Sequence, residues 1–280
     1  DKFNVIQRGL VRAKNIFEVL DDEQIINTSS AHPTNSNFKG EVSFKNVSFA
    51  YNDPDYILKD ISFEIKEGQT VAFVGATGAG KSSIINILSR FYEFQKGEIL
   101  IDGKDLRSFS LETIRNNISV VLQDVFLFSD SVLKNIILDK KDITKKQVIQ
   151  AAKDVGLHNF ISKLPGDYDF NVKERGVALS TGQRQLVSFI RAYVHNPKIL
   201  VLDEATSSID TETEVLIQSA IEKLTKNRTS IIVAHRLSTI KNADKIIVLD
   251  HGKIIEHGSH EELLTKDGFY KNLYEVQFGE

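Results

Sequence analysis

The stretch that decides the fold is residues 75–82, which read Gly75-Ala76-Thr77-Gly78-Ala79-Gly80-Lys81-Ser82 and fit the pattern G-x-x-x-x-G-K-[ST]. An apolar stretch typical of a strand, Thr70–Val74, comes before it, and residues 83–88 carry apolar side chains at helical spacing after it. In this context the glycines let backbone N–H groups close around a phosphate, and the helix N-terminus adds positive partial charge. We therefore predict a phosphate-binding loop in which Lys81 reaches the β- and γ-phosphates of a nucleotide and the Ser82 hydroxyl ligates Mg²⁺.

Composition narrows the class of protein. The 280 residues are 41% hydrophobic and 26% charged, which permits one large domain or two small ones with a substantial core. The net charge of −3, without a long basic run, does not favour nucleic acid as a partner. Cysteine is absent, so we expect neither disulfides nor a thiolate metal site. No apolar run reaches the roughly 18 residues of a membrane-spanning helix. Methionine is absent even at position 1, and we expect the chain to be a piece of a longer protein or an altered sequence.

The N-terminal residues 1 to about 20 predict one amphipathic helix. Apolar side chains recur there at spacings of three and four, at Phe3, Ile6, Leu10, Ala13, Phe17 and Leu20. A polar stretch containing Pro33 follows and indicates a linker up to residue 37. The helix is either a capping element on the core or the tail of an upstream domain, and the linker favours the second interpretation.

Strand patterns surround the phosphate-binding loop. Residues 40–51 and 58–65 alternate apolar and polar side chains, and we predict that they pair in an antiparallel sheet. Residues 97–106 predict a hairpin whose turn is Asp102-Gly103. The nearly continuous apolar run 118–122 is the pattern of a strand buried on both faces.

The second half of the chain alternates helices and short apolar strands. Helical periodicity extends from about residue 131 to 161, and a second helix is predicted over 181–194. Three apolar strands follow, at 199–202, 230–233 and 246–249, with a helix between the first two. This alternation predicts a parallel sheet with helices on both faces. A capping box at residues 259–262 opens a C-terminal helix.

Two carboxylates end the strand over residues 199–202. Asp203 would hold Mg²⁺ through its water shell, and Glu204 would act as general base on the attacking water. Beside a phosphate-binding loop this pair predicts Mg²⁺-dependent ATP hydrolysis. The alternative is a solvated strand end, because acidic pairs are common.

Through these residues and the motifs below, the chain resembles the nucleotide-binding domain of an ATP-binding cassette (ABC) transporter of the exporter type, over roughly residues 40–275. The matching motifs share the order and spacing of that family. They are Tyr51 (A-loop), residues 75–82 (phosphate-binding loop), Gln123 (Q-loop), Val172–Gly176 (X-loop), Leu179-Ser180-Thr181-Gly182-Gln183 (signature LSGGQ), Asp203-Glu204 (Walker B), Ser207–Asp210 (D-loop) and His235 (switch histidine).

The resemblance implies an α/β fold: a P-loop NTPase (RecA-like) core with a parallel sheet, an N-terminal antiparallel β subdomain, and a helical subdomain inserted at about residues 124–190. It also implies two parts of the chain. Residues 1–37 would be an amphipathic helix and linker from a missing transmembrane domain, and residues 38–280 the nucleotide-binding domain.

The resemblance further implies the residues of an ATP and Mg²⁺ site. Catalysis would use Glu204, His235 and Lys81, and Mg²⁺ would be held by Ser82, Gln123 and Asp203. The ATP-binding residues would be Tyr51, Gly75, Ala76, Thr77, Gly78, Ala79, Gly80, Lys81, Ser82, Ser83 and Gln123. Tyr51 offers a flat apolar face to adenine, and the nearby Tyr56 is the residue most easily mistaken for it.

In this family the signature motif contacts ATP bound to a second nucleotide-binding domain. That role falls on Ser180, Thr181, Gly182 and Gln183, with Asp210 in the D-loop. Thr181 departs from the family, which usually has glycine there, and we expect weakened rather than abolished contact. An intact Glu204 beside a variant signature resembles one half of a heterodimeric exporter, and a homodimer stays open. Lys173 departs from the glycine common in the X-loop.

Together these features predict a domain that hydrolyses ATP and powers export, at the cytoplasmic face of the plasma membrane. Its partners would be a second nucleotide-binding domain and the coupling helices of a transmembrane domain, without nucleic acid. The alternatives are a soluble ABC ATPase acting on DNA or ribosomes, and a weakly hydrolysing subunit of a heterodimer. Peptide, lipid and drug all stay open as cargo.

Overall fold

The computed structural model describes residues 2–21, 38–138, 140–203, 210–234 and 236–278, and it divides into two compact units, residues 1–30 and 31–280. The first unit contains the predicted amphipathic helix, α1 (Lys2–Leu20). Its apolar side chains, Phe3 and Phe17 among them, are exposed within this unit. No helix in the described ranges is both long and apolar enough to cross a membrane.

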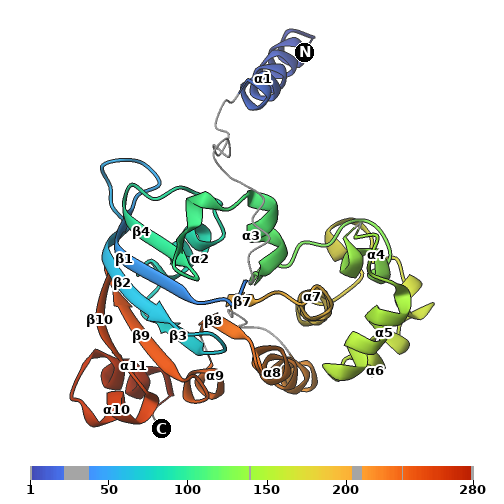
Figure 1. The fold of residues 1–280 in the computed structure, drawn as a ribbon. Coiled ribbons are helices and arrows are strands. Elements are labelled where there is room, and N and C mark those ends of the chain that lie inside the picture. The colour runs from blue at the N-terminus through green and yellow to red at the C-terminus, as the bar shows by residue number, and fades with distance from the viewer. Residues whose placement is uncertain (1, 22–37, 139, 204–209, 235, 279–280) are drawn as a thin grey trace. The chain divides into compact units, whose positions relative to one another are not determined.

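A six-stranded sheet forms the centre of the second unit (Figure 1). In spatial order its strands are β10 (Lys253–Gly258), β9 (Lys245–Asp250), β3 (Thr70–Val74), β8 (Thr229–Val233), β7 (Ile199–Asp203) and β6 (Ile118–Val121). The strands from β9 to β6 run parallel, which confirms the predicted parallel sheet. Strand β10 pairs antiparallel with β9 and was not predicted. Strand β6 lies at the sheet edge, so its middle residues are half-buried and the expectation of two buried faces was wrong.

A four-stranded antiparallel sheet carries the first strands of this unit. Its order is β2 (Leu58–Ile65), β1 (Val42–Phe49), β4 (Lys96–Ile101) and β5 (Lys104–Asp105). The predicted hairpin joins β4 to β5, and its turn residues Asp102 and Gly103 have φ values of +51° and +75°. Positive φ at both turn residues is what a two-residue turn between right-twisted strands requires, so the Asp-Gly pair explains this hairpin.

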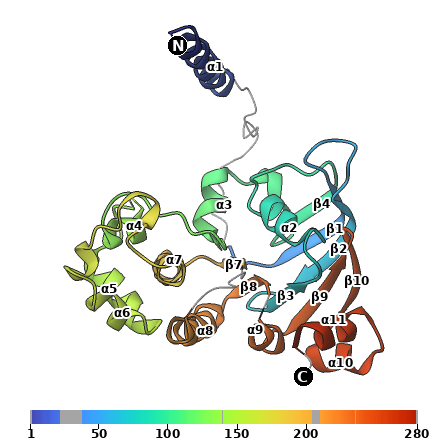
Figure 2. The same ribbon diagram turned by 180° about the vertical axis from the view of Figure 1, so that it is seen from behind.

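The central sheet separates two hydrophobic clusters, and strand β3 contributes alternate side chains to each. Ala72 and Val74 face the cluster with helices α7 (Thr181–Val194) and α8 (Thr211–Thr225). Val71 and Phe73 face the cluster with helix α2 (Lys81–Leu88) and the antiparallel sheet. The expectation of helices on both faces is therefore confirmed, and α2 shares its face of the central sheet with the antiparallel sheet (Figure 2).

The other helices of this unit that the structure describes have ten residues or fewer. They are α3 (Leu111–Asn117), α4 (Val132–Ile137), α5 (Lys145–Asp154), α6 (His158–Ser162), α9 (Leu237–Lys241), α10 (His260–Thr265) and α11 (Phe269–Phe278), with 3₁₀ turns at Leu106–Ser108, Asp167–Asp169 and Glu174–Gly176. The predicted capping box is present, because Ser259 Oγ accepts from the Glu262 N–H at the start of α10.

The helical stretch predicted over 131–161 is three helices, α4 to α6. Leu138 adopts a left-handed conformation that ends α4, Thr144 opens α5 with a capping box, and Gly156 (φ +82°) follows its end. Helix α7 has the bounds that the sequence predicted, since Ser180 and Gln183 form a capping box at its start.

Candidate nucleotide-binding site

The loop of residues 75–82 connects β3 to α2, and close packing explains its first and last glycines. A side chain at Gly75 (φ +149°) would collide with the backbone carbonyl oxygen of Leu249. A Cβ at Gly80 (φ +104°) would lie 2.6 Å from Leu58 Cδ2. Glycine is therefore required at position 75 by space as well as by backbone conformation, and at position 80 by the positive φ, because the end of the Leu58 side chain can shift.

Lys81 is the first residue of α2, and its side chain lies inside this loop. Its side chain is only 7% exposed, and Nζ donates to the carbonyl oxygens of Gly75 and Ala76 at 2.7 and 3.0 Å. Burial lowers the pKa of Lys81, and the negative charge of Asp203 partly opposes that shift. A phosphate entering the loop would offer this ammonium a charged partner in place of two carbonyls.

A cavity of about 470 Å³ opens beside the loop. It is lined by Ile57, Thr77, Gly78, Gly80, Lys81, Ser82, Ser83, Gln123, Asp203 and Val233. Gln123 and Asp203 reach it because β6, β7 and β3 run parallel, which brings their carboxyl ends to one sheet edge. The structure thus brings together the phosphate-binding loop, the Q-loop glutamine and the first Walker B carboxylate.

Two predicted catalytic residues, Glu204 and His235, lie outside the described residues, as do positions 207–209 of the D-loop. Their roles stay predictions. Among the described residues, Asp203 is the last residue of β7, and Val233, the last residue of β8, lines the cavity.

The oxygen donors of this cavity fit Mg²⁺. The Ser82 hydroxyl, the Gln123 amide and the Asp203 carboxylate line the same space, and hard oxygen ligands are what Mg²⁺ prefers. The described part of the chain contains no group of three or more His, Cys, Asp or Glu residues placed to hold a metal. A protein carboxylate combined with nucleotide phosphates is the usual way in which proteins bind this ion, so the donor set needs the nucleotide to complete it.

Tyr51 lies just after β1 and is 39% exposed. Its hydroxyl is 3.3 Å from Ser83 Oγ and accepts a hydrogen bond from Asn86 Nδ2 at 2.7 Å. The rings of Phe49 and Tyr92 pack against it edge to face, with centroids 4.7 and 4.8 Å away. The predicted adenine-stacking residue is thus attached to helix α2, which also begins with Lys81.

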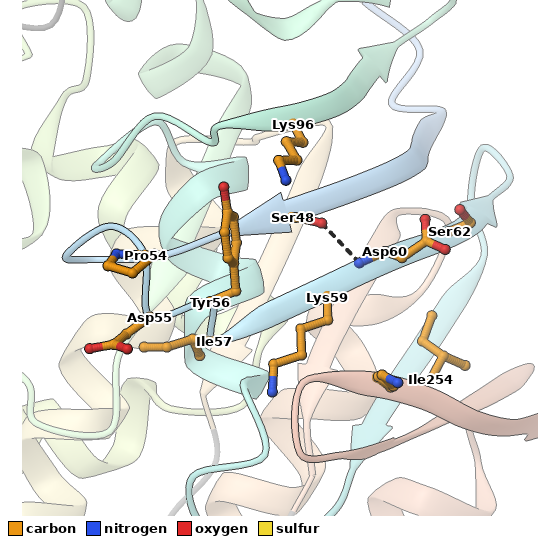
Figure 3. A pocket seen from close by; sticks show the side chains of 11 residues that line it. Ser48, Pro54, Asp55, Tyr56, Ile57, Lys59, Asp60, Ser62, Lys96 and Ile254 are labelled. Atoms are coloured by element: carbon orange, nitrogen blue, oxygen red, sulfur yellow. Dashed lines mark hydrogen bonds between the residues drawn. The ribbon is translucent and has the colours of Figure 1, made fainter.

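Tyr56 lies in a different place, in an open hollow of about 980 Å³ between β1, β2 and β10 (Figure 3). Lys96 Nζ lies 4.9 Å from the centre of the Tyr56 ring. Figure 3 shows the amino group of Lys96 pointing toward this ring and that of Lys59 pointing away from it. Since these charges do not converge on one point, the hollow is not a candidate site despite its size.

The signature residues do not line the described part of the nucleotide cavity. Ser180 Oγ accepts from the Gln183 N–H at 3.2 Å, and Gln183 Oε1 accepts from the Ser180 N–H at 3.0 Å. Gly182 is buried, whereas Thr181 is exposed with its hydroxyl accepting from Arg184 Nη2 at 3.1 Å. Because Thr181 is the first residue of α7, its side chain causes no backbone strain there.

Asp210 is the N-cap of α8. Its Oδ1 accepts from the Thr213 N–H at 2.8 Å, and the hydrogen bonds from Thr213 lower the pKa of the Asp210 carboxyl. The D-loop therefore ends in an ionised residue at the start of a long helix.

Sequence reasoning missed two residues that contact the predicted site residues. Asn86 bonds to Tyr51, and Arg184 bonds both to Thr181 and to the Leu179 carbonyl oxygen. Arg184 lies three residues after Thr181, a spacing that predicts contact on a helix. Nothing in the sequence indicates the pairing of Asn86 with Tyr51, 35 residues away.

Comparison with known proteins identifies the kind of chain that carries this cavity. The family described as "ABC transporter" matches residues 58–207. A probable multidrug resistance ABC transporter ATP-binding/permease protein of Bacillus subtilis is 46% identical over 281 residues, covering 100% of this chain and 41% of that protein. A putative multidrug export ATP-binding/permease protein of Staphylococcus aureus is 48% identical over 264 residues, covering 94% of this chain and 46% of that protein. The chain thus spans less than half the length of these curated relatives.

A solved structure agrees with these relatives. The structure of a bacterial Atm1-family ABC exporter with ATP bound has a TM-score of 0.86 and 40% sequence identity to this chain. The match covers 99% of this chain and 49% of the exporter chain. The similarity therefore extends over the fold described above and leaves about half of the exporter unmatched.

Proposed function

This chain belongs to the ABC transporter family as the nucleotide-binding domain of an exporter, and we propose that it binds and hydrolyses ATP to drive transport across a membrane. The observation that supports hydrolysis best is the single cavity lined by Lys81, Gln123 and Asp203. A lysine for phosphates and oxygen ligands for Mg²⁺ meet there at one edge of a parallel sheet.

The first step of the proposed reaction is binding of the triphosphate. Lys81 exchanges the carbonyl oxygens of Gly75 and Ala76 for the β- and γ-phosphates, and the backbone N–H groups of residues 76–83 surround them. Tyr51 stacks on the adenine ring, because its partly exposed aromatic face offers an apolar surface of matching shape.

The second step is attack of water on the γ-phosphate. Mg²⁺, when bound, neutralises developing charge on the phosphate oxygens. Ser82 and Gln123 would offer oxygen ligands to that ion, and the Asp203 carboxylate would help to hold it. We assign Glu204 as the general base that takes a proton from the attacking water. His235 hydrogen-bonds the γ-phosphate and orients that water, and the products are ADP and phosphate.

A second nucleotide-binding domain completes the proposed site. Ser180, Thr181, Gly182 and Gln183 stand at the N-terminus of α7, where the positive partial charge of a helix start suits a phosphate. Since these residues lie apart from the cavity of their own chain, the phosphate they contact belongs to ATP on the partner. Both a homodimer and a heterodimer with an intact signature are compatible with an exposed Thr181.

Coupling to a transmembrane domain is supported by an exposed aromatic pair on the segment that follows Gln123. Phe126 and Phe128 are 54% and 57% exposed, with ring centroids 5.1 Å apart, and a hollow of about 540 Å³ adjoins Phe128 and Leu138. We propose that coupling helices dock there and at the exposed Glu174 of the X-loop, at the cytoplasmic face of the plasma membrane.

The test is ATP hydrolysis by the 280-residue chain and by its Glu204→Gln variant. We expect phosphate release by the parent chain and a loss of at least about a hundredfold in the variant, as removal of a general base predicts. Glu261→Gln, which removes an exposed carboxylate at the start of α10, is the matched control. An unchanged rate in Glu204→Gln would contradict the assignment of Glu204.

The same variant tests the dimer. Slowed hydrolysis should trap a closed pair, so its mass in solution with ATP and Mg²⁺ is compared with its mass without them. A doubled mass supports a homodimer. Binding of ATP without a change of mass contradicts the homodimer and favours a partner chain with an intact signature.

A further inference from the structure

Tyr51 is attached to helix α2 by a hydrogen bond that has no part in the proposed hydrolysis of ATP. Asn86 Nδ2 donates to the Tyr51 hydroxyl at 2.7 Å, and that hydroxyl also lies 3.3 Å from Ser83 Oγ. Ser83 and Asn86 are three residues apart on one helix, so both side chains are on the face toward Tyr51. The Tyr51 hydroxyl is therefore held by side chains of helix α2.

The ring itself is held from its sides. Phe49 and Tyr92 pack against it at interplanar angles of 79° and 85°. Two perpendicular neighbours and an anchored hydroxyl leave the ring little rotational freedom. The side chain still exposes 39% of its surface, so the ring is fixed in orientation while part of it stays open to a ligand.

We propose that Asn86 is a positioning residue that orients Tyr51 for stacking on the purine ring of ATP, and that this chain consequently requires the tyrosine hydroxyl and not merely an aromatic ring at position 51. The inference rests on the proposed function, since it takes Tyr51 as the adenine-stacking residue. Ordering the ring before the nucleotide arrives removes a cost that binding would otherwise carry.

Two observations separate this role from ordinary support of the fold. The backbone of Asn86 accepts from the Phe91 N–H at 2.9 Å, and this bond survives any change of the side chain. The side chain itself is half-buried and lies outside the hydrophobic clusters. Its loss should therefore affect Tyr51 and leave the packing of α2 intact.

The experiment measures equilibrium binding of ATP and of inorganic tripolyphosphate to the 280-residue chain and to Asn86→Ala, Tyr51→Phe and the double variant. We expect each single change to weaken ATP binding about fivefold, the factor that one hydrogen bond of ordinary net strength is worth. The double variant should be no weaker than either single variant, because both remove the same interaction. Tripolyphosphate, which has no base to stack, should bind all of them within about twofold.

Asn159→Ala serves as the matched control, because Asn159 is exposed on α6 in the helical region. Weakening of ATP binding that multiplies in the double variant would overturn the proposal, and so would an equal loss of both ligands in Asn86→Ala. A parent chain that fails to bind ATP would overturn the proposed function as well. A parent chain that binds ATP, with Asn86→Ala binding it equally well, would overturn this inference alone.

Discussion

The phosphate-binding loop and the start of α7 both present a helix N-terminus, yet they are built differently. In the loop, Lys81 is buried, Gly75 packs against the backbone of Leu249, and Gly80 packs against the side chain of Leu58. At the start of α7, Ser180 and Thr181 are exposed, and their side chains bond back to their own helix. The loop can enclose a phosphate within one chain, whereas the start of α7 is an open surface. A helix N-terminus becomes a complete site only when other elements close around it, which is why a partner domain is proposed for the second region.

The phosphate-binding loop also differs from the X-loop in which residues adopt positive φ. In the phosphate-binding loop these are glycines. In the X-loop, just before the signature, they include Lys173 (φ +61°, ψ −177°) and Arg175 (φ +53°, ψ +17°). Side chains at such angles carry backbone strain, so we expect the phosphate-binding loop to be conformationally relaxed and the X-loop to be strained.

Replacing Gly75 by alanine should have the largest effect on the stability of the chain. The added Cβ collides with the Leu249 carbonyl, so we expect a loss of about 3 kcal/mol or more in the free energy of unfolding, measured by urea denaturation. Gly78→Ala is the control, because Gly78 (φ +83°) has open space around its Cβ position and should cost only about 1 kcal/mol. Equal losses of unfolding free energy in the two variants would show that the contact with β9 is not the reason why position 75 needs glycine.

Lys173→Gly tests the strain assigned to the X-loop. Its φ and ψ fall in a region that only glycine adopts readily, so we expect stabilisation of about 1 kcal/mol in the same denaturation experiment. Arg175→Gly should gain less, since its left-handed conformation is one that other residues visit. A larger gain at position 175 would contradict this ranking.

Thr181→Gly tests whether the Thr181 side chain keeps a phosphate away from the open start of α7. Removing the Cβ and hydroxyl lets a phosphate approach the backbone of α7, and we expect ATP-dependent dimers of Glu204→Gln to tighten about threefold. Sedimentation at several protein concentrations measures the change. Arg184→Ala, which releases the Thr181 hydroxyl without removing it, should not tighten them.

The smallest expected effect is a pH dependence at the other end of α7. His195 shares a 3.0 Å hydrogen bond with the Ile136 carbonyl oxygen. Burial, followed by the charges of Lys140 and Arg191, lowers its pKa below 6.5 in the folded chain. Protonation therefore favours the unfolded chain, so stability is fully present above about pH 6.5 and falls as the pH drops through the lowered pKa. His195→Gln should reduce the change of the denaturation midpoint between pH 7 and pH 5. His251→Gln, at an exposed turn, should leave that change as it is.

Local signals account for the elements that sequence reasoning predicted well. The turn Asp102-Gly103, the capping box at Ser259, and the strand, loop and helix around residues 75–82 are each specified by residues within a few positions of one another. The division of residues 131–161 was harder, because apolar periodicity continues across Leu138 and Gly156, where the helices end. Strand β10 was missed since its pairing partner, and not its own pattern, defines it.

The sequence by itself thus determined the phosphate-binding loop, the parallel strands and the family, because glycines, caps and apolar periods act over short distances. The family resemblance already assigned Gln123, Asp203 and Lys81 to one site, and the structure shows the cavity that they line. Only the tertiary structure decided that Tyr51 bonds to Asn86 and that the antiparallel sheet packs with α2 on one face of the core. These contacts join residues far apart along the chain. No local propensity encodes them, because they arise when parallel strands bring their carboxyl ends to one edge and separate layers pack together.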